Sequence, residues 1–144
     1  MGPAIHDEHH VARYCRQSTF VAGKPSYLAF LLKAATDTEP REPYLSVFWL
    51  EALAGSNLDE RLADLRREVI AQNILAARKS ALYAVQNVGN TRAVVKGRSV
   101  DGRSIRITEE PPPRFHAGIH DTADDEDTIA KALFESVIDY RAAT

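Results

Sequence analysis

The sequence predicts a single α+β domain in which an antiparallel meander packs against a central amphipathic helix and a C-terminal helix. Two segments carry apolar residues at helical spacing, whereas the segment between them changes to the alternation and turn residues of strands. The length of 144 residues is typical of one domain, and 44% apolar with 26% charged residues is typical of a folded chain. We therefore expect residues 1–144 to form one compact unit.

The N-terminal residues are predicted to form a mobile terminus followed by a strand. Residues 1–10 are the expected mobile part. Residues 11–18 alternate as a strand does, with Val11, Arg13 and Cys15 on one face. Cys15 is the only cysteine, so it has no partner for an internal disulfide, and we expect it to be a small buried side chain.

Two apolar segments lead to the central helix. Residues 27–32 are a buried strand or a short helix, which periodicity alone cannot separate, and residues 44–55 are core. A helix is predicted over residues 58–71, and Ser56 with Asp59 resembles a capping box at its start. The apolar stripe of this helix is Leu58, Leu62, Leu65 and Val69.

Residues 80–108 are predicted to form antiparallel hairpins. Residues 80–88 read as a strand that ends at a Gly-Asn turn, and residues 91–95 read as its partner. A second turn at Asp101-Gly102 suits the type I′ geometry, in which both central residues have positive φ. An antiparallel meander is expected here.

A proline-rich crossover loop is predicted between this meander and the last helix. Residues 111–113 are prolines and cannot donate backbone hydrogen bonds, so the loop is expected to span residues 109–121. The C-terminal helix is expected to begin near Thr122 or Asp124, where acidic side chains favour a helix start. Its apolar stripe is predicted to be Ile129, Leu133, Val137 and Tyr140.

Positive charge is concentrated in residues 59–106. This segment holds ten of the eighteen Lys and Arg residues against five acids, so it carries +5 while the rest of the chain carries −7. A basic meander could contact nucleic acid, although the pI of about 6.2 is below the value of about 9 typical of dedicated nucleic-acid binders. The other interpretation is a solvated surface balanced by the acidic C-terminal segment.

The five histidines raise the possibility of a divalent metal site. An i,i+4 pair such as His116 and His120 supplies two converging ligands only on a helix, and the prolines upstream with Gly118 between them make a helical turn doubtful. The pair does not form an HExxH motif, because no glutamate lies between. The candidate metal ligands are His116, His120, Asp121, His9 and His10.

A catalytic role for His116 is a second interpretation of the same loop. His116 beside Arg114 could act as general acid or base, with arginine stabilising developing negative charge, as in phosphoryl or nucleotidyl chemistry. Arg13, with Arg16 and Ser18, could complete such a site. Alternatively, His116 donates to a nearby backbone carbonyl and anchors the loop.

Several common functional motifs are missing. The sequence contains no GxGxxG, GxxxxGK[ST], GxSxG or CxxC pattern, so a nucleotide cofactor is not expected. It also contains no run of 18 apolar residues and no apolar signal segment, so no membrane association is expected and a cytoplasmic location is the simplest prediction.

Four segments carry a resemblance to known proteins: VARYCRQSTF, YLSVFWLE, AVQNVGNT and FHAGIH. They resemble a group of short bacterial proteins without assigned activity, associated with mobile-element or defence gene neighbourhoods. The resemblance covers most of the chain, and Phe48 stands where Asn is expected. It implies motif positions at Arg13, Ser18, Trp49, Glu51, Gly89 and His116.

Three functions follow as hypotheses. The first is a small intracellular accessory protein that binds a protein partner, for example in a bacterial defence or mobile-element system. This hypothesis rests on the absence of a catalytic motif. The second is a metal-dependent hydrolase or nuclease centred on His116. The third is nucleic-acid binding through residues 59–106, which predicts an affinity that falls steeply with salt.

Overall fold

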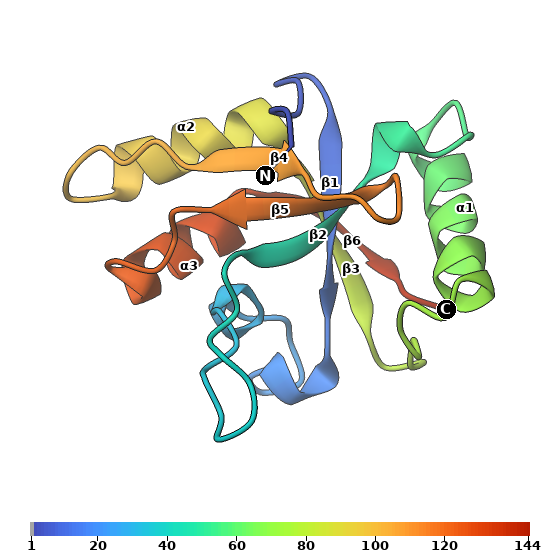
Figure 1. Ribbon diagram of the computed structural model, residues 1–144, viewed down its shortest axis with the longest axis horizontal. Helices are drawn as coiled ribbons and strands as arrows, with labels where there is room; N and C mark the ends of the chain where they lie inside the picture. Colours follow the sequence, from blue (N-terminus) through green and yellow to red (C-terminus); the bar gives the residue numbers. More distant parts are fainter. Residues whose placement is uncertain (1) are drawn as a thin grey trace.

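A computed structural model describes residues 2–144 as one α+β domain (Figure 1). Its six-stranded antiparallel sheet has the order β4-β5-β2-β1-β3-β6. The strands are β1 (His10–Cys15), β2 (Leu45–Trp49), β3 (Leu82–Asn87), β4 (Arg106–Glu109), β5 (His116–His120) and β6 (Val137–Ala142). The helices are α1 (Leu58–Ala71), α2 (Val88–Arg98) and α3 (Glu126–Glu135), with short 3-10 segments at Gln17–Thr19, Tyr27–Phe30 and Leu50–Ala52. The predicted fold class is confirmed.

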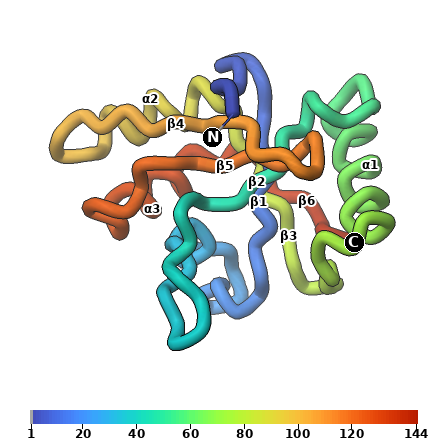
Figure 2. Tube along the Cα trace, viewed as in Figure 1, coloured from blue at the N-terminus to red at the C-terminus, as the bar shows by residue number. Residues whose placement is uncertain are grey.

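The sheet has an apolar cluster on each face. One cluster joins the sheet to α2 and α3, and the other joins it to α1, which lies apart from those two helices in Figures 1 and 2. Strand β1 divides between them, because Val11 and Cys15 belong to the first cluster and Ala12 to the second. Cys15 is 1% exposed, and burial raises the pKa of its thiol to about 11. Its predicted burial is therefore confirmed.

Helix α1 forms over the predicted residues, with a different cap. Leu62, Leu65 and Val69 are fully buried, as their spacing predicts. The N-cap is Asn57, whose side chain accepts from the Glu60 backbone N–H, and not Ser56. The predicted capping box of Ser56 and Asp59 is therefore wrong, and the Ser56 N–H and hydroxyl donate to the Glu60 carboxylate instead.

The predicted hairpin after residue 87 is wrong, because residues 88–98 form helix α2. Asn87 caps this helix by accepting from the Asn90 N–H, where the sequence suggested a strand end and a turn. Val88, Thr91 and Val95 are buried at helical spacing against α3. Packing on a distant helix therefore decides the conformation of a segment whose β-branched residues favour a strand.

Two further boundaries differ from the predictions. The Asp101-Gly102 turn is not of type I′, because Gly102 has φ +64° but Asp101 does not have a positive φ, and it joins α2 to β4 and not two strands. Helix α3 ends at Glu135, so Val137 and Tyr140 lie in β6 and not on a helical stripe. Pairing of β6 with β3 provides the backbone hydrogen bonds that a longer helix would otherwise have supplied.

The terminal residues and the proline-rich segment are more ordered than predicted. Ile5 is buried, and residues 2–5 run beside β4, where the Ile5 N–H donates to the Ile107 carbonyl (Figure 2). Residues 1–10 are therefore not an unattached terminus over the part that the structure describes. Residues 109–121 are not one loop either, since β5 pairs with β2 and β4 over residues 116–120.

Strand β6 forms an edge of the sheet that side chains protect. The Tyr140 N–H donates to the Asp139 carboxylate over 2.9 Å, and Arg66 Nε donates to the Ala142 carbonyl over 2.9 Å. Ile138 is 54% exposed on this edge. Occupied backbone groups disfavour addition of a strand from another chain.

No helix within residues 2–144 combines the length and the apolar character that a membrane span requires.

Candidate functional site

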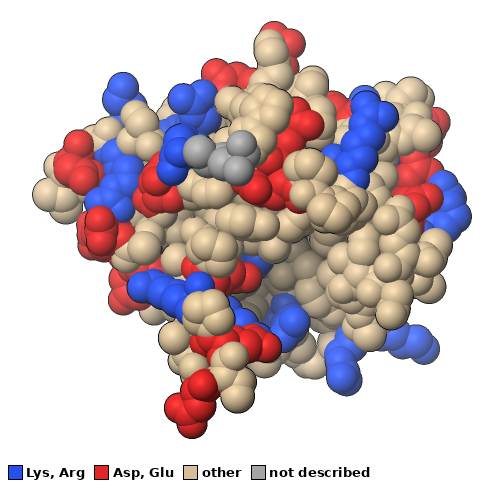
Figure 3. Space-filling view, viewed as in Figure 1, with Lys and Arg blue, Asp and Glu red and all other residues tan. Residues whose placement is uncertain are grey.

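The candidate site is a hollow of about 440 Å³ between β1, β2, β5 and the two 3-10 segments near residues 17–31. Figure 3 shows this face hollowed near its centre, with basic side chains inside the hollow. The polar residues that line it include Arg13, Arg16, Ser18, Glu42, Ser46 and His116. Four of these residues, Arg13, Arg16, Ser18 and His116, were predicted to share a site, and the fold brings them together.

Ser46 and His116 form a hydrogen-bonded pair at the wall of this hollow. The register places Ser46 opposite Gly118 and His116 opposite Phe48, so both side chains lie on one face of the sheet. Ser46 Oγ lies 2.9 Å from His116 Nε2, and His116 Nδ1 lies 2.7 Å from the Glu110 carbonyl oxygen. A carbonyl only accepts, so Nδ1 carries the proton and Nε2 accepts from the Ser46 hydroxyl.

Arg13 fills the gap where β1 and β2 diverge. The two strands pair only at Val11–Trp49 and Ala12–Phe48. Beyond this point Arg13 Nε donates to the Ala29 carbonyl over 2.9 Å, and Nη1 donates to the Ser46 carbonyl over 2.7 Å. Burial is the largest influence and lowers the pKa of Arg13, and Glu42 opposes this shift.

Tyr44 separates the two histidines of β5. Its ring centroid lies 6.0 Å from that of His116 and 5.0 Å from that of His120. His120 Nε2 lies 2.8 Å from Glu110 Oε1, and Thr108 also donates to this carboxylate. Burial raises the pKa of Glu110, but the hydrogen bonds from Thr108 and His120 outweigh it and leave the pKa lowered.

The predicted metal ligands do not converge. His116 and His120 lie on a strand, where residues four apart are separated by about 13 Å and not by one helical turn. Asp121 is paired with Arg106 over 2.6 Å, and the Arg106 hydrogen bonds lower the pKa of Asp121. Within residues 2–144 no three His, Cys, Asp or Glu side chains are grouped as a metal site requires. The fold therefore does not bring the five predicted ligands together.

The N-terminal histidines contact residues around Trp49 and not His116. His9 Nδ1 accepts from the Trp49 indole N–H over 3.1 Å, and the two rings stack. His10 Nδ1 lies 2.8 Å from Glu51 Oε2. Trp49 and Glu51 thus hold the start of β1 in place.

Arg114 lies outside the candidate site. It is exposed and lines a separate hollow with Asp64 and Glu68, on the α1 side. The fold does not bring Arg114 and His116 to one hollow, because Arg114 lies in a turn that the His116 N–H closes by donating to the Pro113 carbonyl over 2.9 Å. Arg13 is an arginine that lines the same hollow as His116.

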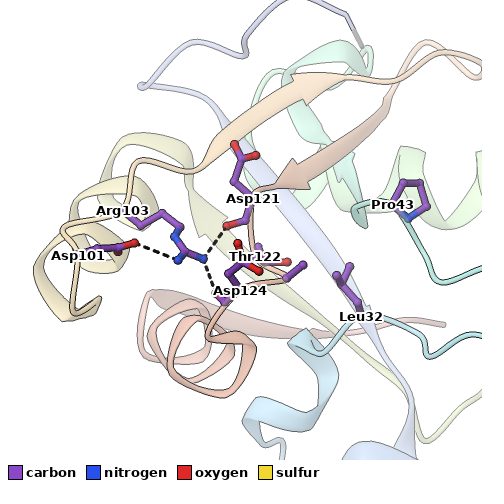
Figure 4. A pocket seen from close by; sticks show the side chains of 8 residues that line it. Leu32, Pro43, Asp101, Arg103, Asp121, Thr122 and Asp124 are labelled. Carbon is purple, nitrogen blue, oxygen red and sulfur yellow. Dashed lines mark hydrogen bonds and ion pairs between the residues drawn. The ribbon is translucent and has the colours of Figure 1, made fainter.

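A second large hollow, of about 470 Å³, is lined by the loop around Arg103 (Figure 4). Arg103 Nη2 donates to the Asp101 carboxylate over 3.0 Å, and Nη1 donates to the carbonyl oxygens of Asp121 and Asp124. These contacts satisfy the guanidinium within the loop, so we interpret it as a structural anchor.

The basic segment does not form a continuous positive surface. Its cations are distributed over α1, α2, β4 and the connecting loops, and α1 and α2 pack on opposite faces of the sheet. Six of its ten cations are ion-paired: Arg61, Arg67, Arg92, Arg98, Arg103 and Arg106. Much of the +5 charge is therefore balanced locally, and nucleic-acid binding stays an untested prediction.

Comparison of the chain with family models, curated proteins and solved structures found no match.

Ser46 is the residue of the candidate site that sequence reasoning missed. It is the one polar residue of the strand LSVFW, and the apolar composition of residues 44–55 predicted that the whole segment is core. Its hydrogen bond to His116 joins residues 70 positions apart, so no local spacing reveals it.

Gly118→Ala is expected to destabilise the domain by about 1–3 kcal/mol, because an added Cβ would lie 2.6 Å from the Tyr44 ring between the histidines. Gly97→Ala is the matched control, since a Cβ there meets nothing within 4 Å and alanine favours the α2 helix by up to about 1 kcal/mol. Urea unfolding measures both changes. An unchanged free energy of unfolding in Gly118→Ala would contradict this prediction and show that the Tyr44 ring moves aside at no cost.

Proposed function

We propose that this chain is a hydrolase in which Ser46 is the nucleophile and His116 is the general base. The observation that carries the proposal is the Ser46 Oγ to His116 Nε2 distance of 2.9 Å, with Nδ1 bound to the Glu110 carbonyl. A nucleophile, a base and a group that orients the base are the three parts of a serine hydrolase site. Here the Glu110 backbone carbonyl is the group that orients the base.

The reaction follows from these contacts. The Ser46 hydroxyl transfers its proton to His116 Nε2 as Oγ attacks the carbon or phosphorus of an ester. His116 then protonates the leaving group, and a water molecule hydrolyses the ester formed on Ser46. The Arg13 guanidinium donates to the Ser46 backbone carbonyl over 2.7 Å and lines the same hollow, so it adds positive charge to the site in which negative charge develops.

The hypothesis of an accessory protein that binds a protein partner makes a different prediction. In that case His116 only anchors the segment before β5 through its hydrogen bond to the Glu110 carbonyl. A cytoplasmic location and a place in a bacterial defence or mobile-element system are compatible with either function.

A neutral alkyl fluorophosphonate tests the proposal without knowledge of the substrate. Ser46 Oγ forms a bond to phosphorus, fluoride leaves, and the hydroxyl proton goes to His116. We expect one adduct per chain by intact mass, mapped to Ser46 by peptide mass spectrometry. Ser46→Ala should abolish it, whereas Ser18→Ala, which changes another serine of the same hollow, should not. No adduct, or an adduct that persists in Ser46→Ala, would return the chain to the binding-protein class.

A further inference from the structure

The Arg13 guanidinium is a partly buried cation without a matching anion. Its two hydrogen-bond acceptors, the carbonyl oxygens of Ala29 and Ser46, are neutral. It forms no ion pair with any acid in residues 2–144, although Glu42 lies on the rim of the hollow. Placing a cation in a desolvated site without an opposite charge is unfavourable, so this position favours an anion from outside the chain.

Arg16 adds a second cation to the same hollow. It follows the end of β1, is exposed, and its side chain has no hydrogen bond or ion pair among the residues that the structure describes. Lys33 also lines the hollow but is paired with Glu39 over 3.2 Å, and Glu42 is the only acid on the lining. Two arginines are thus available where one carboxylate opposes them.

We propose that the hollow binds an oxyanion group of the substrate, a phosphate or a carboxylate, through Arg13 and Arg16. Guanidinium groups match the geometry of such oxygens and form charge-assisted hydrogen bonds with them. That this anion is part of a substrate rests on the proposed hydrolase activity, whereas binding of the anion does not depend on Ser46. An anionic group held here would place the rest of the ligand beside Ser46 and His116, since both line the same hollow.

Isothermal titration with phenyl phosphate, benzoate and uncharged benzamide tests the inference. We expect at least one of the two anions to bind while benzamide does not, and the stronger anion identifies the source of the oxygens. Arg16→Gln should weaken that binding by about 10- to 100-fold, the loss expected for a hydrogen bond between charged groups. Arg114→Gln is the matched control, because Arg114 is an exposed arginine on a separate hollow.

Arg16→Gln is the decisive variant because Arg13 bridges β1 to β2 and its replacement endangers folding. Equal affinity in Arg16→Gln, equal binding of benzamide, or no binding of either anion would overturn the inference. The two proposals fail separately. Ser46 modified by the fluorophosphonate without anion binding removes only the oxyanion site, and anion binding retained in Ser46→Ala without any adduct removes only the hydrolase.

Discussion

His116→Ala is expected to slow the reaction of Ser46 with an alkyl fluorophosphonate by about 10²- to 10⁴-fold, the usual contribution of a general base. The variant removes Nε2, which accepts the Ser46 proton, so the Ser46 hydroxyl loses its general base. Time courses of adduct formation by mass spectrometry measure the effect. His116→Gln should be equally slow, because a glutamine amide can replace a hydrogen bond but cannot take up the proton.

His120→Gln is the control for this result. His120 lies on the same strand and the same face as His116, but it contacts Glu110 and Thr108 and not Ser46. We expect it to retain nearly the full rate. An unchanged rate in His116→Ala, with thermal unfolding showing an intact fold, would reduce His116 to a structural anchor.

Gln86→Ala is expected to destabilise the domain by about 2–4 kcal/mol. Gln86 is fully buried in β3, and its Nε2 donates to the Leu133 carbonyl over 3.0 Å and to Ser136 Oγ over 2.9 Å. Truncation removes both hydrogen bonds and leaves a cavity between the sheet and α3. Urea unfolding monitored by Trp49 fluorescence measures the change in the free energy of unfolding.

Gln86→Met separates volume from hydrogen bonding. Gln86 Oε1 has no partner within residues 2–144, so methionine removes a buried unpaired oxygen while it keeps most of the volume. The acceptors are not stranded either, since Ser136 Oγ still donates to Leu133 and receives from Thr91. We expect a cost below about 1.5 kcal/mol. A cost equal to that of alanine would show that the amide hydrogen bonds, and not packing, hold this position.

The candidate site was predictable only in part. Arg13 and His116 were identified as chemically suitable residues, and the fold places both on one hollow. Arg114 is two residues from His116 in the sequence but lines another hollow. Asp121 forms an ion pair with Arg106. Ser46 was missed because a lone serine in an apolar strand carries no sequence signal. Residue type suggests chemistry, but which groups meet depends on strand register.

Local physics explains what the sequence by itself determined: the α+β class, the helix over residues 58–71 and the burial of Cys15. Each depends on periodicity, caps or side-chain polarity within a few residues. Tertiary structure alone decided that residues 88–98 are helical and that residues 116–120 are a strand. Their backbone partners and buried faces lie on distant segments, so the free energy that selects their conformation appears only when those segments pack. The Ser46–His116 contact has the same origin, because pairing of β2 with β5 creates it.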